Sequence, residues 1–270
     1  MNNFLAGIQG LYDQNRFLEA YLQSAEYWKP ARSIDGLSLD ELILGGRLAA
    51  RLGGWRLSRQ LFRKAVERHP SDARARYFAQ GLRRRGWKLF DQLLSWEENA
   101  ELEDADAVTQ ASWLASQAVI WASLRDFARA HACLERSKGL ATKESWVFSC
   151  QASVLGMEDR WNDAFKSAEI SWEMNAGTPY GAHSLGESLV NLRRIREAAE
   201  RLSKAAEGCE SFEVTATAGW HVCALAETTE GEERRRYLAR AEELAEQASL
   251  RAPLADRETR GWFARSRRRR

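Results

Sequence analysis

The pentapeptide AHSLG at residues 182–186 differs by one residue from the G-x-S-x-G box that presents a nucleophilic serine in many hydrolases. In that box the serine lies in a sharp turn between a strand and a helix, whereas the residues before Ser184 have helical spacing and no strand pattern. The order serine, aspartate, histidine is also missing, because Asp256 is the one aspartate after Ser184 and no histidine follows it. We therefore predict that Ser184 is not a nucleophile, that the chain is not an enzyme and that it holds no cofactor.

The cysteines and histidines show no metal-binding spacing either. No two of the four cysteines form a C-x-x-C pair, and a zinc site would need distant residues such as His131 and His221. We predict no metal site and expect reduced, buried thiols, as in a cytoplasmic protein, at Cys133, Cys150, Cys209 and Cys223. The opening MNNFLAGIQGLYDQ has no basic leader, and no stretch of about eighteen apolar residues occurs, which favours the cytoplasm and excludes a transmembrane helix.

The composition indicates a globular, helical chain. Of its 270 residues 44% are hydrophobic, which is ample for a continuous core, and a net charge of +2 gives no global argument for nucleic acid. Ala, Leu, Glu, Arg and Gln dominate, apolar residues recur every three or four positions, and β-branched runs are missing. The four prolines fall where helical patterns stop or restart. We expect about fourteen short helices joined by tight turns.

An internal repeat organises these helices. The segments DFARAHACLERS, RWNDAFKSAEIS and RIREAAERLSKA begin at residues 126, 160 and 194, which are thirty-four apart. Each opens with a large apolar residue followed three positions later by alanine, as in Phe127 with Ala130 and Trp161 with Ala164. Twelve residues before that alanine stands a small residue, at Ala118, Ala152 and Gly186. In a fourth copy, which opens with Trp55, Gly46 stands twelve residues before Ser58.

On these residues the sequence resembles the tetratricopeptide repeat family, whose unit is thirty-four residues folded as two antiparallel helices. Leu185 and Gly186 stand where the family has its Leu-Gly pair, so Gly186 is expected to let the first helix approach the second. The resemblance implies an all-α, right-handed α-solenoid of about seven repeats, with insertions near SWEENAELEDADAV and ETTEGEE. The expected copies are 1–34, 39–72, 73–106, 111–144, 145–178, 179–211 and 212–253, followed by a basic tail or linker at 254–270.

The resemblance also implies a non-enzymatic scaffold that binds a peptide or protein surface in a concave groove lined by the first helices. The aromatic residues that open the second helices are expected to be core, at Phe17, Trp55, Trp87, Phe127 and Trp161. The expected groove residues are Arg47, Arg51, Arg76, Arg83, Ser112, Ser116, Trp146, Ser149, Ser153, Tyr180, His183, Ser184 and Glu187. Their small hydroxyls suit an extended, uncharged backbone; alternatively, these small residues merely let helices pack.

Two basic regions leave alternatives open. The segment 51–88 holds twelve lysines and arginines and invites an acidic partner, unless the acidic loop 97–106 folds back over it. The tail RGWFARSRRRR could contact phosphate, so an RNA-binding helical-repeat protein is one alternative, and the recognition arm of a larger enzyme with a catalytic domain beyond residue 270 is another. The apolar first segment also allows self-association through the N-terminal helix.

Overall fold

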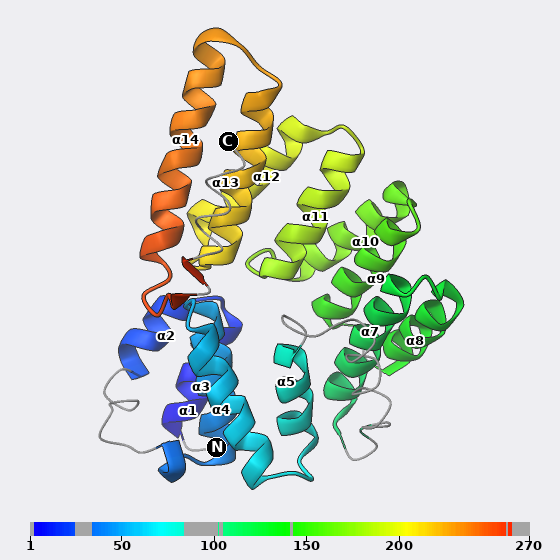
Figure 1. Ribbon diagram of the computed structural model, residues 1–270, viewed down its shortest axis with the longest axis vertical. Coiled ribbons are helices and arrows are strands. Elements are labelled where there is room, and N and C mark those ends of the chain that lie inside the picture. Colours follow the sequence, from blue (N-terminus) through cyan, green and yellow to red (C-terminus); the bar gives the residue numbers. More distant parts are fainter. Residues whose placement is uncertain are drawn as a thin grey trace.

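The computed structural model describes residues 3–24, 34–83, 102, 105–140, 143–257 and 259–260, and in these ranges every regular element is helical (Figure 1). The helices are α1 (Asn3–Asp13), α2 (Phe17–Ser24), η1 (Ile34–Gly36), α3 (Leu39–Arg51), α4 (Trp55–Arg68), α5 (Ala73–Arg83), α7 (Ala107–Ser123), α8 (Phe127–Leu140), α9 (Ser145–Met157), α10 (Trp161–Met174), α11 (Pro179–Asn191), α12 (Ile195–Gly208), α13 (Phe212–Glu227) and α14 (Gly231–Leu250). The expectation of an all-α chain is confirmed.

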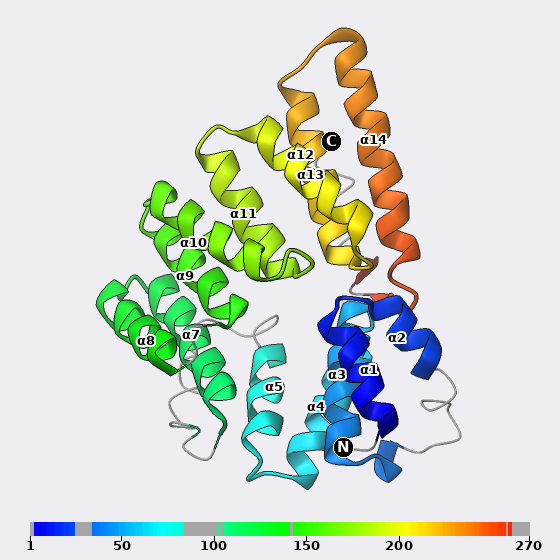
Figure 2. The same cartoon turned by 180° about the vertical axis from the view of Figure 1, so that it is seen from behind.

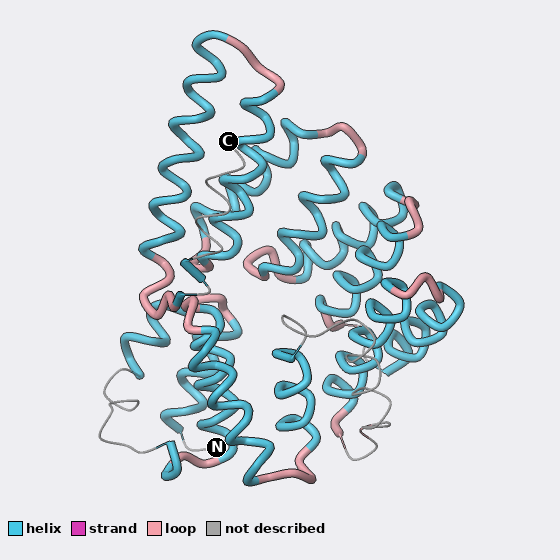
Figure 3. Tube along the Cα trace, viewed as in Figure 1, coloured by secondary structure: helices cyan, strands magenta, loops and turns pink. Residues whose placement is uncertain are grey.

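The helices form consecutive antiparallel pairs, such as α7 with α8 and α9 with α10, and successive pairs stack into an α-solenoid (Figures 1 and 2). Short loops join the two helices of each pair, as the tube in Figure 3 shows. The first helices of the pairs also pack on each other from repeat to repeat, as α7 does on α9 and α9 on α11. Such nearest-neighbour packing is how solenoids bury a continuous core.

A left-handed residue recurs at one place in the turn between the helices of a pair. Asn15, Arg125, Asp159 and Arg193 have φ between 60° and 65°, and Gly53 has φ 84°. Each lies two positions before the large apolar residue that opens the second helix. The next amide then bonds back to the end of the first helix, as Arg194 N–H does to Leu189 O (2.8 Å) and Arg160 N–H to Leu155 O (3.0 Å). This αL ending satisfies carbonyls that the helix leaves unpaired and reverses the chain direction.

The aromatic residues that open the second helices differ in burial. Phe17 and Trp55 are buried, whereas Phe127 and Trp161 are half-buried at the turn. Trp87, expected to play the same part, lies outside the described residues. These aromatic residues are therefore part of the core towards the N-terminus and partly solvent-exposed in the middle of the array.

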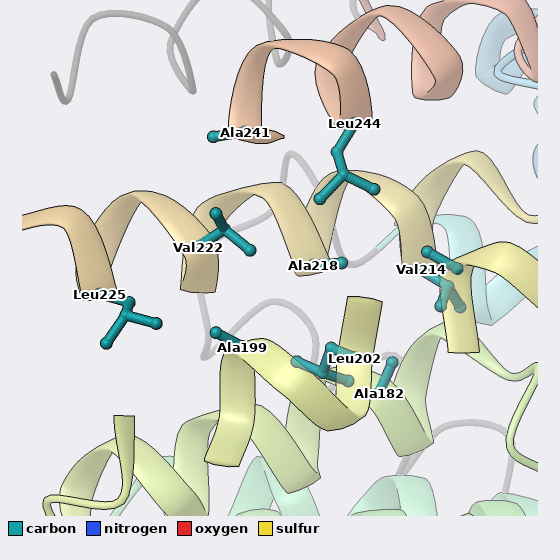
Figure 4. Close-up of a cluster of buried hydrophobic side chains, with 10 residues drawn as sticks. Ala182, Ala199, Leu202, Val214, Ala218, Val222, Leu225, Ala241 and Leu244 are labelled. Atoms are coloured by element: carbon teal, nitrogen blue, oxygen red, sulfur yellow. The ribbon is translucent and has the colours of Figure 1, made fainter. Parts of the chain in front are cut away.

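Alanines and glycines bring the helices close together. Figure 4 shows one of the resulting cores, in which Leu202 of α12 and Leu244 of α14 pack around α13 against small residues such as Ala182 and Ala218. A β-carbon at Gly186 would lie 2.9 Å from Cδ1 of Leu202, which agrees with the expected close approach of α11 to α12. It would also collide with Nε2 of His221 on α13, a contact that the sequence did not indicate.

The two ends of the solenoid touch. In Figures 1 and 2 the chain runs in an arc from α1 to α14, and the segment after α14 returns to lie against the first two pairs. Leu254 N–H donates to Leu52 O (3.0 Å) and Asp256 N–H to Gly53 O (3.3 Å), so residues 254–256 dock on the turn between α3 and α4. These residues begin the segment that the sequence suggested as a tail or linker, and its division from the repeats at residue 254 stays a prediction.

Candidate functional site

A cluster of arginine and aromatic side chains joins helices from both halves of the arc. We call it the inner cluster; it comprises Tyr12, Arg47, Arg51, Phe78, Trp146, Tyr180 and Glu213. Its members come from α1, α3, α5, α9, α11 and α13, which are all first helices of their pairs or, for α5, the helix in that position. Figure 1 shows second helices such as α8 and α14 on the outer side of the arc.

Arg47 and Arg51 stand one helical turn apart at the end of α3, so they point to the same side. The guanidinium carbon of Arg47 lies 4.3 Å from the centroid of the Tyr12 ring and 5.6 Å from that of Phe78. Its Nη1 also donates to the Gln9 side chain (3.2 Å). Stacking between rings holds the planar guanidinium in one orientation, which is a favourable arrangement for a cation beside aromatic faces.

Arg51 connects the two halves of the molecule. Its Nη1 donates to Glu213 Oε2 at 2.8 Å, its Nε donates to Tyr12 Oη at 3.3 Å, and its guanidinium lies 5.2 Å from the Tyr180 ring centroid. Tyr180 in turn meets Trp146 edge to face, with ring centroids 4.3 Å apart. The Arg51 and Glu213 side chains are 17% and 16% exposed, so water screens this pair less than a surface pair.

Charge and burial shift the pKa values of two side chains near the inner cluster. Burial alone would raise the pKa of Tyr12, but the adjacent guanidinium groups of Arg51 and Arg47 outweigh it and bring the pKa below its usual value. Burial raises the pKa of Glu144, at the start of α9, against the opposing influence of the Trp146 amide and of Arg47. Two arginines at the end of α3 thus lie near carboxylates at the beginnings of α9 and α13, with Arg51 paired to Glu213 and Arg47 close enough to Glu144 to influence its pKa.

The serines expected to line a groove are mostly buried between helices. Ser116, Ser149 and Ser184 are 2%, 2% and 5% exposed, and Ser112 is also buried. Ser149 and Ser171 share a hydrogen bond of 2.7 Å, and Ser184 Oγ donates to Ser149 O at 3.5 Å. These hydroxyls meet neighbours in the same chain and offer no surface to a ligand in this structure. Ser184 also lies inside α11, without the strand and turn that a hydrolase serine requires.

The remaining expected residues fall at different places. His183 and Glu187 are exposed on α11 and 3.7 Å apart, while Ser153 and Arg76 are half-buried. The side chain of Arg83, most of the acidic loop 97–106 and the arginines from 265 onwards lie outside the described residues. Arg47, Arg51, Trp146 and Tyr180 are thus the expected residues that the structure brings together.

A second set of contacts, which sequence reasoning missed, caps two helices from far along the chain. Glu210 Oε2 accepts hydrogen bonds from the Leu18 and Glu19 amides at 2.7 and 3.2 Å, at the beginning of α2. Asp256 Oδ2 accepts from the Arg56 amide at 2.6 Å, at the beginning of α4. A signal was present, because the residues before α2 and α4 are arginine and glycine, and neither has a side chain that accepts hydrogen bonds from these amides.

The described residues contain a pocket of moderate size away from the inner cluster. This pocket of about 300 Å³ is lined by Trp113, Leu114, Arg136 and Leu140 among others. Within the described part of the chain no three His, Cys, Asp or Glu residues are grouped as metal ligands, and no helix there is long and apolar enough to cross a membrane. All four cysteines lie in the described ranges as thiols outside any disulfide, with Cys150 buried. Leu5 and Ile8 of α1 pack in the chain's own core, while self-association through α1 stays a prediction.

Comparison with known proteins identifies the fold. No family model matches the sequence, and no curated protein matches it. Among solved structures, TTC0263, a tetratricopeptide repeat protein of Thermus thermophilus, matches with a TM-score of 0.53 at 16% identity over 76% of this chain and all of that one. A chain of the APC/C hetero-tetramer Cut9–Hcn1 matches with a TM-score of 0.55 at 12% identity, and yeast Tom70 with 0.51 at 11%.

Both latter matches cover 93% of this chain, but only 48% of the APC/C chain and 50% of Tom70, so this chain spans about half their length. At these identities the likeness concerns the fold alone. The chain thus has the fold of tetratricopeptide repeat proteins, as its thirty-four-residue pattern predicted.

Proposed function

We propose that this chain is a non-catalytic protein-interaction scaffold that binds a peptide or protein segment at the inner cluster. The fold supports a scaffold in general, since a solenoid presents an extended inner surface for partners. Among the structural neighbours, Cut9 is found in a hetero-tetramer with Hcn1. The observation that carries the proposal is the meeting of two arginines and four aromatic rings from the first helices at one place.

The residue types of the cluster are those that dominate binding energy at protein interfaces. Trp, Tyr and Arg are enriched among the few residues whose truncation weakens binding by about 2 kcal/mol or more. Tyrosine and tryptophan supply a large contact area with only two side-chain torsions to immobilise, so they lose little entropy on binding. Tyr180 is 47% exposed, more than the 39% of Phe4 on α1, so we expect Tyr180 to be the residue that contacts the bound segment most closely.

The guanidinium of Arg47 is the group expected to select the ligand. Arg47 is stacked on Tyr12, and the guanidinium fork of a held arginine binds a carboxylate through two parallel hydrogen bonds. We therefore expect a segment that carries at least one acidic residue beside an apolar one. The RNA alternative has no comparable support, because Arg51, one of the arginines on which it would depend, is paired with Glu213.

Selection from a displayed peptide library, followed by titration of the selected peptides, tests the proposal. Tyr180→Ala should weaken binding by about tenfold or more, as expected for a truncated anchor residue. Ile170→Ala is the matched control, since Ile170 is an exposed apolar residue, 39% accessible, on the second helix α10. Equal binding by the two variants, or no selected peptide at all, would contradict a site at the inner cluster.

Nucleic acid is tested in the same series. Titration with single-stranded RNA should show weak binding whose affinity is unaffected by Tyr180→Ala. A strong RNA affinity that falls steeply with salt concentration would instead favour the alternative function, because phosphate contacts release counterions.

A further inference from the structure

The contacts that close the arc, which share the Arg51–Glu213 pair with the inner cluster, are called the clasp. It consists of Glu210 at the beginning of α2, Asp256 at the beginning of α4, the docked segment 252–257 with Thr259, and the pairs Arg51 with Glu213 and Asn15 with Asn175. The Asn15 and Asn175 side chains are 2.6 Å apart, and Thr259 Oγ1 donates to Gly53 O at 2.5 Å. These bonds join residues between 160 and 206 positions apart in the sequence.

The clasp differs in kind from the packing within the solenoid. Helices within and between neighbouring pairs bury leucines and alanines along their length, as in the core of Figure 4. The clasp is mainly polar, and its apolar part is a small cluster of Trp55, Phe212 and Ala252 together with Leu254 against the α1–α3 core. Repeats of a solenoid normally contact only their neighbours, so such a junction can open while every pair stays folded.

Closure also engages the residues of the proposed binding site. Arg51 bonds to Glu213 and lies over the Tyr180 ring, so the end of α3 covers the beginnings of α11 and α13. Asn15, in the turn after α1, bonds to Asn175 just before α11. The first pair and α3 therefore occupy part of the inner surface of the later repeats, where a bound segment would lie.

From this geometry we infer that the clasp is an intramolecular latch: it holds the arc closed over the inner cluster, and the open form is the one that binds a partner segment at full affinity. The inference rests on the proposed function for its binding half, whereas the opening of the arc is independent of any ligand. A ligand that binds only the open form has an apparent affinity reduced by the fraction of molecules that are open. Opening separates Arg47 and Tyr12 from Tyr180 and Trp146 and frees the surface between them, so weakening the clasp should raise affinity without any substitution in the inner cluster.

The carboxylates Glu210 and Asp256 give a selective way to weaken it, because neither belongs to the inner cluster. Loss of a capping side chain shifts an equilibrium by about fivefold. Glu210→Ala with Asp256→Ala should therefore raise the ratio of open to closed molecules by roughly twenty-fivefold. Ser38→Ala with Asp106→Ala is the matched control, because these residues cap α3 and α7 from directly before them and take no part in the clasp.

Opening is measured by small-angle scattering and by hydrogen exchange of the Leu254 amide, whose partner Leu52 O is unchanged in both variants. The clasp variant should show a larger radius of gyration and exchange at Leu254 about tenfold faster or more, while the cap control keeps the parental values. A variant with Gly54→Cys and Leu254→Cys supplies the closed reference. A β-carbon at Gly54 would lie 3.0 Å from that of Leu254, closer than the roughly 3.5–4.5 Å found in disulfides, so a small separation of the two backbones brings the cysteines to bonding distance.

Binding is then compared with a pooled library of short peptides. The clasp variant should bind the pool about tenfold more tightly than the parent, and the oxidised cysteine variant more weakly than its reduced form, with Gly54→Cys alone as the redox control. An unchanged radius in the clasp variant, or a larger radius with unchanged peptide affinity, would overturn the latch. A larger radius with no peptide bound by any variant would leave the opening established and refute the proposed function instead.

Discussion

Gly46→Ala tests how closely the first helix must approach the second within a pair. An added β-carbon would lie 2.6, 2.8 and 2.9 Å from three atoms of the Phe62 ring, whereas carbon atoms in contact prefer about 3.5–4.0 Å. Phe62 is 3% exposed and stacks on Phe78 with ring centroids 5.2 Å apart, so its ring has no free space to move into. Overpacking of this kind destabilises a fold by about 1–3 kcal/mol.

Helix propensity opposes this strain, because alanine is better than glycine inside a helix by about 0.8–1.0 kcal/mol. The net expectation is a loss of up to about 2 kcal/mol, or a fall in Tm of up to several degrees for a chain of this size. Gly219→Ala is the matched control. A β-carbon there meets Leu244 Cβ at 3.5 Å, an ordinary contact, so the propensity gain should remain and Tm should rise.

The assay is thermal and urea unfolding followed by circular dichroism, with Phe62→Leu added to make a double-mutant cycle. Space made by the smaller side chain should relieve the clash, so Gly46→Ala should destabilise the Phe62→Leu background by at least about 0.5 kcal/mol less than the parent. A Tm for Gly46→Ala equal to or above the parental value would refute the close packing. Additive effects of the two changes would show that Phe62 is not the obstacle.

Three further outcomes follow from the same structure. Arg193→Gly should stabilise the chain by up to about 1 kcal/mol in urea unfolding. The exposed Arg193 has φ at 63°, where an L-residue is strained by roughly 1–2 kcal/mol and glycine is not. A loss of stability would contradict this reasoning. Burial, and secondarily the charge of His183, lowers the pKa of His221 to about 4. This value is below the ordinary 6.5, so between these two pH values the unfolded chain binds a proton that the folded chain does not. The stability contributed by neutral His221 is therefore complete above about pH 6.5 and is lost as the pH falls towards 4, by at most about 3 kcal/mol. The His221→Gln variant should lack this part of the pH dependence of unfolding. Arg51→Met should destabilise the fold by about 1–3 kcal/mol, because it leaves the partly buried Glu213 carboxylate without its cation. Adding Glu213→Gln to that variant should recover part of the lost stability. No recovery would mean that the two side chains are not coupled.

The sequence by itself determined the helical pairs and their succession. Phe17, Trp55, Phe127 and Trp161 each begin a second helix, as their common spacing predicted, and Gly186 lies where α11 must approach α12. These features are readable because each depends on residues within one repeat or its neighbour, and the same contacts recur along the chain. The αL turns are equally local, although Arg125 and Arg193 give no sign of them by residue type.

The position of the expected binding residues was only partly readable. The sequence predicted that serines and aromatic residues line the groove together, since both lie on the first helices at helical spacing. In the structure Ser116 and Ser149 lie between packed helices, while Tyr180 remains exposed. A helix face a few residues wide contains both the seam that packs on the next repeat and the surface beside it, and spacing in one helix does not separate them.

The closure of the arc could not be predicted from the sequence. Arg51 and Glu213 are 162 positions apart, and Asp256 caps a helix that begins 201 residues earlier, at Trp55 (256 − 55). Whether such groups meet depends on the small rotation between successive repeats, added over the whole array, and no single repeat encodes that sum. The uncapped amides of α2 and α4 were visible in the sequence, but the carboxylates that satisfy them were brought there by the curvature of the solenoid.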